Sequence, residues 1–204
     1  MFDKLSEDIL QYEYICGVDE VGRGPLCGDV VAAAVIMPKY SFIEGVNDSK
    51  KLSVKKRDAL YEKIVKEAIG IGIGRVTPDI IDDINIKNAT RLAMKKAVEN
   101  LKTREGQKIV PNIVLIDAEV IDLDIFQKSI IKGDQKVYAI ACASIIAKVT
   151  RDLDFIEYEK KYPGYDFLNN KGYGTKKHRE ALKRLGKTPI HRNTFIKKIL
   201  ENDK

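Results

Sequence analysis

The sequence predicts an α/β fold in which helices cover a mixed or parallel β-sheet. Short apolar segments rich in β-branched residues alternate along the chain with segments of helical spacing, an order typical of such sheets. The 204 residues correspond to one domain, or to one domain with a small extension. A composition of 44% hydrophobic and 32% charged residues can fill a core. Collagen-like, coiled-coil and low-complexity proteins are therefore excluded.

The expected elements can be placed in order. A short polar helix opens the chain. Strands are expected at 12–19, 26–37, 69–76, 111–117 and 126–131, where apolar or alternating residues are bounded by turn residues. Helices are expected at 53–68, 81–101 and 138–162, with Ser53 and Thr77-Pro78 as N-terminal caps and a break near 85–88. The first half of the last helix is nearly all small or apolar, so it must be buried.

Basic residues concentrate in the last part of the sequence. The chain has 36 basic and 30 acidic residues, a net charge of +6. Residues 171–198 hold ten Lys or Arg and one acid, a balance of +9, so the other residues sum to −3. A polyanion-binding surface beside an acidic centre would have this distribution. A solvated amphipathic helix would have it equally, and charge alone does not separate the two.

Membrane, disulfide and zinc proteins are not expected. The longest apolar run, 30–37, is far short of the roughly 20 residues that a bilayer requires, and no charged-then-apolar leader precedes a cleavage site. The three cysteines, Cys16, Cys27 and Cys142, are odd in number and form no CxxC pair. We expect a soluble protein of a reducing compartment, the cytoplasm.

Three acids stand at or just beyond the ends of expected strands. Asp19 ends the first strand, Asp117 ends the fourth, and Asp134 follows the fifth. A helix cap or a surface salt bridge is the better interpretation of any one of them. If the strand ends converge, however, the carboxylates need a cation, and all-oxygen ligands select Mg²⁺ or Mn²⁺.

Glu20 poses a problem of strand parity, because successive side chains of a strand point to opposite faces. Asp19 and Glu20 can aim inward together only through a bulge or turn, which the adjacent glycines Gly22 and Gly24 make feasible. These glycines also approach a dinucleotide-binding fingerprint. That motif requires a helix directly after the turn, and a β-branched strand follows here, so nicotinamide binding is excluded.

Several motifs in this sequence resemble those of the type 2 ribonucleases H, in particular bacterial ribonuclease HII. They are GVDEVGRGPL at 17–26, DSKKL at 48–52, INI at 84–86, AT at 89–90, AM at 93–94, Asp117, KGD at 132–134, ASIIAKV at 143–149, RD at 151–152, GYGT at 172–175, HR at 191–192 and Phe195. The resemblance covers most of residues 15–195. One departure is Ala118, where the family usually has glycine, and we expect its methyl group to be tolerated.

The resemblance implies an RNase H-like mixed sheet flanked by helices, with a basic helical C-terminal extension at about 171–204 of a single catalytic domain, 1–204. It implies metal-dependent endonucleolytic cutting of RNA in RNA–DNA hybrids and 5′ to single ribonucleotides in duplex DNA, in primer removal and ribonucleotide excision repair. Two Mn²⁺ or Mg²⁺ ions are implied as cofactors, and a monomer as the working form. The implied catalytic and metal-binding acids are Asp19, Glu20, Asp117 and Asp134. The implied substrate-binding residues are Gly22, Arg23, Gly24, Lys50, Tyr173, Lys176 and Lys177.

Three other kinds of protein fit this sequence less well. A non-catalytic nucleic-acid-binding module would have no reason to keep the four acids. A DNA nuclease of the same fold would not need the Gly22-Arg23-Gly24 loop or Tyr173, which in the resembled family read the 2′-hydroxyl and the junction. Ribonuclease HIII usually carries an additional N-terminal domain, for which the residues before Tyr14 leave no room. Ser144 and the cysteines are interpreted as core packing.

Overall fold

A five-stranded mixed sheet forms the centre of the computed structural model, which describes residues 2–3, 5–47 and 49–201, apart from the Lys50 side chain. The strands lie in the order β3-β2-β1-β4-β5, where β1 is Ile15–Val21, β2 is Val30–Ile36, β3 is Gly70–Val76, β4 is Ile113–Asp117 and β5 is Gln127–Ile130. Strand β1 pairs antiparallel with β2 and parallel with β4. The predicted mixed α/β fold is confirmed.

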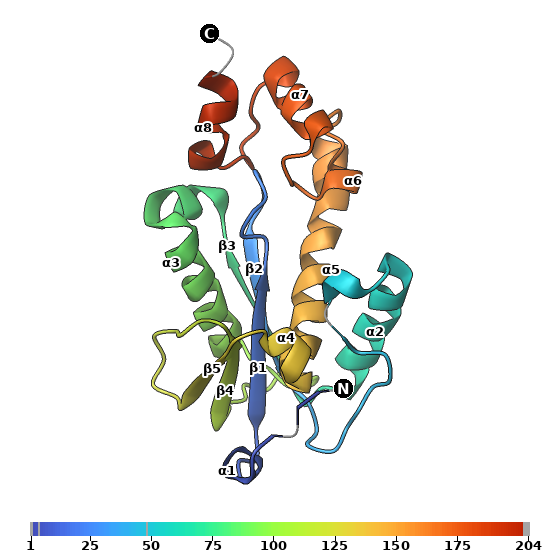
Figure 1. Ribbon diagram of the computed structural model, residues 1–204, viewed down its shortest axis with the longest axis vertical. Coiled ribbons are helices and arrows are strands. Elements are labelled where there is room, and N and C mark those ends of the chain that lie inside the picture. Colours follow the sequence, from blue (N-terminus) through green and yellow to red (C-terminus); the bar gives the residue numbers. More distant parts are fainter. Residues whose placement is uncertain (1, 4, 48, 202–204) are drawn as a thin grey trace.

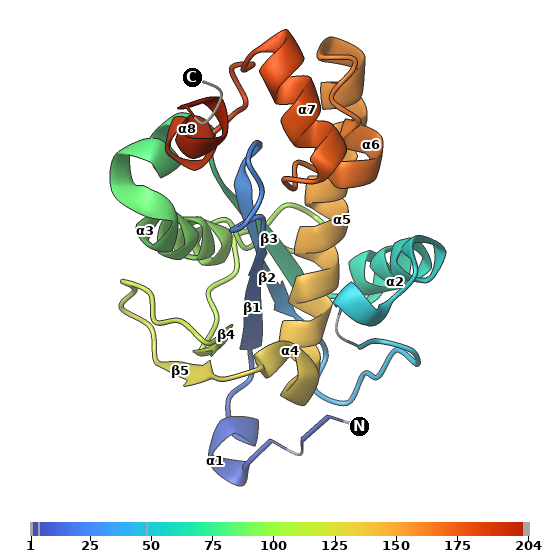
Figure 2. The ribbon, with the colours of Figure 1, turned by 45° about the horizontal axis from the view of Figure 1, so that its top comes forward.

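Helices cover both faces of this sheet, α3 on one and α5 with α2 on the other (Figure 1). The helices are α1 (Glu7–Leu10), α2 (Val54–Glu67), α3 (Pro78–Glu99), α4 (Gly133–Lys136), α5 (Tyr138–Lys161), α6 (Phe167–Asn170), α7 (Lys176–Leu185) and α8 (Asn193–Glu201), with a 3₁₀ turn at Ser49–Lys51. The predicted C-terminal helical extension is present as α7 and α8. Figure 2 shows both at the end of the sheet where the β1–β2 connection lies.

Alternating glycines explain how closely α3 lies on β3. A β-carbon at Gly72 or Gly74 would overlap the backbone carbonyl oxygens of Ala97 and Ala93. The helix therefore rests directly on the strand backbone. These glycines belong to the alternation of Ile and Gly in the third strand. The sequence shows this alternation, but not the close approach of α3 that requires it.

The predicted break in α3 falls at Asn85, whose φ of 65° is not helical. Its side-chain oxygen accepts hydrogen bonds from the N–H groups of Lys87 (3.0 Å) and Asn88 (3.2 Å). Asn85 thus caps the second half of the helix, which begins again at this point. At the start of α2, Ser53 accepts from Lys56 N–H as expected, whereas the Thr77 side chain makes no cap bond to α3.

Two of the strand boundaries that differ from the prediction bear on the site. Strand β1 runs through Val21, so Asp19 and Glu20 lie inside it, in regular register opposite Ala33 and Ala32 of β2. The expected bulge is therefore wrong. Strand β2 starts four residues later than predicted, because residues 26–29 use their backbone groups to bind loops and buried arginine side chains. No helix in the described part of the chain is long and apolar enough to cross a bilayer.

Candidate active site

Asp19 and Asp117 occupy neighbouring positions on parallel strands. Val18 of β1 is paired with Ile116 of β4, and each aspartate is the next residue on its strand. Parallel strands carry equivalent residues to the same edge of the sheet, which is why two acids 98 positions apart in the sequence meet. Asp19 is buried, with 5% of its surface exposed.

Asp134 is brought to the same region by its neighbour Gly133. The Gly133 N–H donates to Asp117 Oδ1 over 2.6 Å, at the start of the short helix α4. A β-carbon at Gly133 would lie 2.6 Å from Ile140 Cδ1 and 3.3 Å from Asp117 Oδ1, so a larger residue would require these side chains to shift. Asp134 is itself buried. The backbone therefore brings together the segments that carry Asp19, Asp117 and Asp134, which meets the condition set for a cation site, although Asp19 lies inside β1 and not at its end.

Glu20 points to the other face of the sheet from Asp19. Strand alternation places it with Cys16 and Val18, which pack in the core cluster under α3, whereas Asp19 faces α5. Arg23 Nη1 lies 3.6 Å from Glu20 Oε1. Although Asp19 and Glu20 point to opposite faces of the sheet, their carboxylates are still close enough to repel each other.

Burial raises the pKa of Asp19 well above its usual range, and repulsion from Glu20 and Asp117 raises it further. A hydrogen bond from the Ser144 hydroxyl and one from the Glu20 N–H (2.7 Å) only partly offset this cost. A divalent cation would neutralise the repelling charges. The donors are all oxygen atoms, which fits Mg²⁺ or Mn²⁺.

Two polar residues beside the acids were not recognised from the sequence. Ser144, interpreted there as packing, bonds the Asp19 carboxylate and lies 2.8 Å, oxygen to oxygen, from the Ser49 hydroxyl. Glu119, which is buried, binds Arg91 (2.9 Å) and Arg23 (3.5 Å). Its position two residues beyond Asp117 is the only signal in the sequence. Both residues extend the polar network around the four acids.

The glycine loop, residues 22–28, lies against the loop that carries Tyr173. Leu26 N–H donates to Gly172 O over 2.8 Å. A β-carbon at Gly24 would lie 3.8 Å from Tyr173 Cε1, so the tyrosine ring lies over this glycine. Tyr173 is 43% exposed, so it is not a core tyrosine.

The predicted basic residues are divided between two surfaces. Lys176 shares a shallow pocket with Gly174, Arg179, Lys183 and one acid, Glu180, whose Oε1 lies 3.9 Å from Lys176 Nζ. Lys177 instead lines a neighbouring pocket with Glu159 and Asp166 among its walls, a poorer setting for a phosphate. The Lys50 side chain lies outside the described part, although its neighbour Ser49 contacts Ser144.

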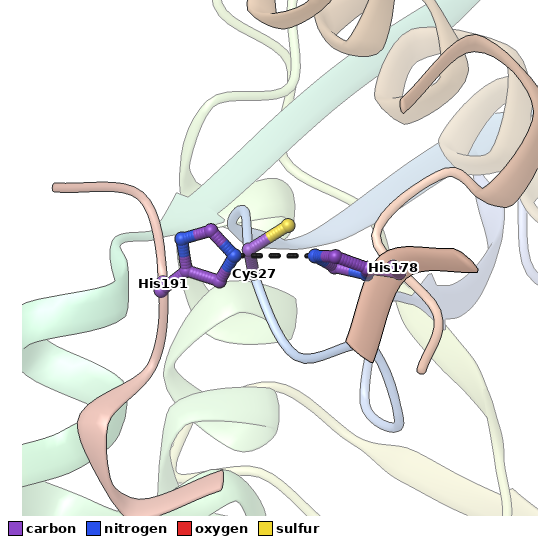
Figure 3. Close-up of side chains that lie close together, drawn as sticks. All are labelled: Cys27, His178 and His191. Atoms are coloured by element: carbon purple, nitrogen blue, oxygen red, sulfur yellow. Dashed lines mark hydrogen bonds between the residues drawn. The ribbon is translucent and has the colours of Figure 1, made fainter. Parts of the chain in front are cut away.

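Cys27 of the glycine loop forms a buried cluster with His178 and His191 (Figure 3). Among the described residues, this is the one group of three metal-ligand side chains whose ligand atoms all lie within 4.8 Å of one another. The sequence predicts no such group, because its members are far apart in the chain.

Hydrogen bonds account for both rings of this cluster without a metal. Thr188 N–H donates to His191 Nδ1 (2.9 Å), so the neutral ring carries its proton on Nε2 and donates to His178 Nε2 (3.1 Å). His178 in turn donates from Nδ1 to Tyr173 O (2.9 Å). A metal-binding His191 Nε2 would need a proton on Nδ1, where the Thr188 N–H already points. The pair is therefore a neutral hydrogen-bonded chain that ends at the Tyr173 carbonyl.

Comparisons with known proteins agree on one family. The family model described as Ribonuclease HII matches residues 16–198. A curated Ribonuclease HII of Alkaliphilus oremlandii is 57% identical over 189 residues, 93% of each chain. The crystal structure of ribonuclease H2 from Pyrococcus horikoshii superposes with a TM-score of 0.76 at 28% identity, covering 93% of this chain and 98% of that one. Bst-RNase HIII in complex with Mn²⁺ shares the fold, with a TM-score of 0.70 at 19% identity over 94% and 70% of the two chains. The family model matches nearly the whole sheet and extension, and a relative shares more than half of its aligned residues with this chain. This chain therefore belongs to the ribonuclease HII family.

Proposed function

We propose that this protein is an endonuclease that hydrolyses RNA in RNA–DNA hybrids and cuts duplex DNA 5′ to a single ribonucleotide, leaving a 3′-hydroxyl and a 5′-phosphate. One observation carries the proposal. The edge of the sheet that holds Asp19 and Asp117 adjoins the glycine loop, and the exposed ring of Tyr173 lies over Gly24. An acidic centre and a surface able to contact a sugar are thus side by side.

In this proposal Asp19, Glu20, Asp117 and Asp134 hold two divalent cations, Mn²⁺ or Mg²⁺. The chemistry that two bound cations supply at such a site is activation of a water and stabilisation of the leaving oxygen. The protein's own contribution is to hold two of the carboxylates in place by hydrogen bonds. Gly133 fixes Asp117 by its N–H, and Ser144 with the Glu20 N–H fixes Asp19. No side-chain nucleophile is required.

The substrate-binding part of the proposal assigns different tasks to two regions. Gly22, Arg23, Gly24 and Tyr173 recognise the ribonucleotide, since only the 2′-hydroxyl and the local duplex shape distinguish it from its neighbours. Lys176 and Lys177, with Lys50, contact phosphates and supply affinity that does not depend on sequence. A single catalytic domain over 1–204, a cytoplasmic location, a monomeric state and roles in primer removal and ribonucleotide excision repair complete the proposal.

The test is a series of otherwise identical duplexes with no, one or four ribonucleotides in one strand, incubated with the protein with and without Mg²⁺ or Mn²⁺. We expect metal-dependent cutting of the second and third duplexes, and 5′-phosphate on the downstream product. Cutting of the all-DNA duplex would indicate the rival DNA nuclease. Binding without cutting in either metal would indicate the non-catalytic module.

A further inference from the structure

Two arginine side chains lie completely inside the protein behind the glycine loop. Arg192, which directly precedes α8, has 0% of its surface exposed, and Arg151 of α5 has 1%. A buried charge is expensive unless hydrogen bonds compensate it. The partners of these guanidinium groups therefore show what the protein gains from burying them.

The partners of Arg192 are backbone carbonyl groups of the glycine loop. Its Nε and Nη2 donate to Gly28 O (3.0 and 2.7 Å), its Nη1 to Arg23 O (3.1 Å) and Pro25 O (2.9 Å), and its Nη2 also to Gly22 O (2.6 Å). Within the described ranges, no carboxylate oxygen lies within 4.0 Å of this guanidinium. The group is thus dedicated to the conformation of one loop.

This arrangement dictates where the amide groups of the loop point. In a trans peptide the C=O of one residue and the N–H of the next point in opposite directions, and the described chain has no cis peptide. With Gly22 O and Arg23 O turned inward to Arg192, the N–H groups of Arg23 and Gly24 point away from it. Neither N–H donates to an acceptor in the described part of the protein.

The outward side of the loop is the side of the candidate active site. Tyr173 lies beside Gly24 there, and Glu20 lies 3.6 Å from the Arg23 side chain. Two unpaired donors are therefore held next to the acids and the exposed ring, where a ribose hydroxyl or a phosphate oxygen would accept from them.

Arg151 supports the same loop from α5. Its Nη2 donates to Cys27 O (3.0 Å) and its Nη1 to Lys171 O (2.9 Å), so it joins the glycine loop to the segment before Tyr173. Gly22, with φ of 96°, fits directly against its Nε, where a β-carbon would overlap. The buried side chains of Arg151 and Arg192 thus fix the glycine loop and the segment before Tyr173 from the interior of the protein, out of reach of a substrate.

We infer that Arg192 is a positioning residue, which holds the glycine loop so that the N–H groups of Arg23 and Gly24 face the substrate. This inference rests on the proposed function for what the loop binds. Lysine cannot replace Arg192, because one ammonium group lacks the planar fork that reaches four carbonyl groups at once. Arg192 acts on turnover through the loop, whereas the lysines of α7 supply affinity.

The test compares Arg192→Lys with Ile196→Ala, a matched control one turn along. Ile196 is 1% exposed and its truncation weakens the packing of the same extension, but leaves the guanidinium in place. We measure melting temperature, duplex Kd, kcat on the duplex with one ribonucleotide, and hydrogen–deuterium exchange of peptides covering 22–28. For Arg192→Lys we expect kcat to fall roughly 100-fold with Kd unchanged, and faster exchange in the loop. For Ile196→Ala we expect a lower melting temperature with near-normal kcat.

Several outcomes would overturn the inference. The first is that Arg192→Lys has a normal kcat and that its loop 22–28 exchanges hydrogen as slowly as in the wild-type protein. The second is that Arg192→Lys and Ile196→Ala lose the same amount of kcat when their melting temperatures fall by the same amount. If the wild-type protein does not cut the duplex at all, the proposed function fails, and loop exchange still decides the role of Arg192. If Arg192→Lys does not fold, the test is the exchange rate of the Arg192 Nε–H proton in the wild-type protein. Rapid exchange of that proton with water would contradict its hydrogen bond to Gly28 O and so overturn the inference.

Discussion

The ring of Tyr173 lies over Gly24, with its Cε1 atom 3.8 Å from the position that a β-carbon of Gly24 would take. The two residues come from loops almost 150 positions apart, joined by the hydrogen bond from Leu26 N–H to Gly172 O. A flat exposed ring and a residue without a side chain leave a surface on which a sugar or base can lie.

Truncation of this ring is expected to impair cutting at a lone ribonucleotide without affecting the fold. Tyr173→Ala should lower kcat/KM roughly 10- to 100-fold, because a stacking contact is lost. Its melting temperature should stay within a degree or two, since the side chain is 43% exposed. Tyr173→Phe keeps the ring and should retain most of the activity. An alanine variant that cuts normally would remove Tyr173 from the recognition site.

Neutralising Asp19 should abolish cutting and raise stability. The pKa of this carboxyl group is raised by burial and by repulsion from Glu20 and Asp117, so Asp19→Asn relieves an unfavourable interaction while removing a proposed metal ligand. We expect no detectable turnover in saturating Mn²⁺ and a higher melting temperature in metal-free buffer. Asp122→Asn, at a side chain that is 99% exposed, is the control and should change neither. Near-normal turnover of Asp19→Asn would refute its role as a ligand.

Ala118 is expected to cost stability through its backbone. Its φ of 51° lies in the left-handed region that glycine adopts without strain. Ala118→Gly should therefore raise the free energy of unfolding by about 0.5–1 kcal/mol, after allowing for the entropy of glycine in the unfolded chain. Ala68→Gly, at φ of −61°, should lower it. Chemical denaturation of both variants measures the difference, and a loss in both would show that Ala118 is unstrained.

The two histidines, which are the only ones in the sequence, should differ in tautomer. We expect ¹⁵N spectra of the neutral rings to show the proton on Nε2 of His191 and on Nδ1 of His178. A metal bound through both Nε2 atoms would instead leave Nδ1–H on both rings. The spectra thus distinguish the hydrogen-bonded chain from a metal site.

The same pair predicts a fall in stability at mildly acidic pH. Burial, followed by the nearby His178, lowers the pKa of His191 to about 4, and burial lowers that of His178. The unfolded chain then takes up protons near pH 6.5 before the folded one does, so the free energy of unfolding falls as pH drops from about 6.5 towards 4. His191 alone should contribute a loss of about 2 kcal/mol between pH 7 and pH 5. His191→Gln should show a correspondingly shallower dependence, and an equal slope in both proteins would contradict the assignment.

The lysines of α7 should differ in their contribution to affinity. The charge reversals Lys176→Glu and Lys183→Glu together should raise the duplex Kd and reduce its salt dependence, because both lysines line the pocket next to Gly174. Lys177→Glu should have a smaller effect, since Glu159 and Asp166 line its pocket. Binding titrations at several salt concentrations measure this. A change in the preference for ribose over deoxyribose would show that α7 does more than supply affinity.

The strands and helices and their sequence along the chain could be predicted because apolar periodicity marks them locally, and the break at Asn85 was placed in the same way. The strand order β3-β2-β1-β4-β5 could not, because pairing joins segments that are distant in the chain. The meeting of Asp19 with Asp117 follows from the parallel pairing of β1 with β4, which the sequence raises only as a condition. The bonds from Ser144 to Asp19 and from Arg192 to Gly28 were not, because each depends on which face of a distant helix or segment reaches the strand end. A serine among alanines, or an arginine in a basic tail, has no local pattern that identifies a buried partner.

The distance in sequence between Arg192 and Gly22 has a consequence during synthesis. The two residues are 170 positions apart, so a ribosome adding about 5–20 residues per second needs roughly 10–30 s to proceed from one to the other. For that time the acids of β1 and the glycine loop exist without the side chain that orients the loop. A nascent chain can therefore assemble much of its sheet before its glycine loop is held in place, and the loop reaches its final conformation only after the extension has emerged.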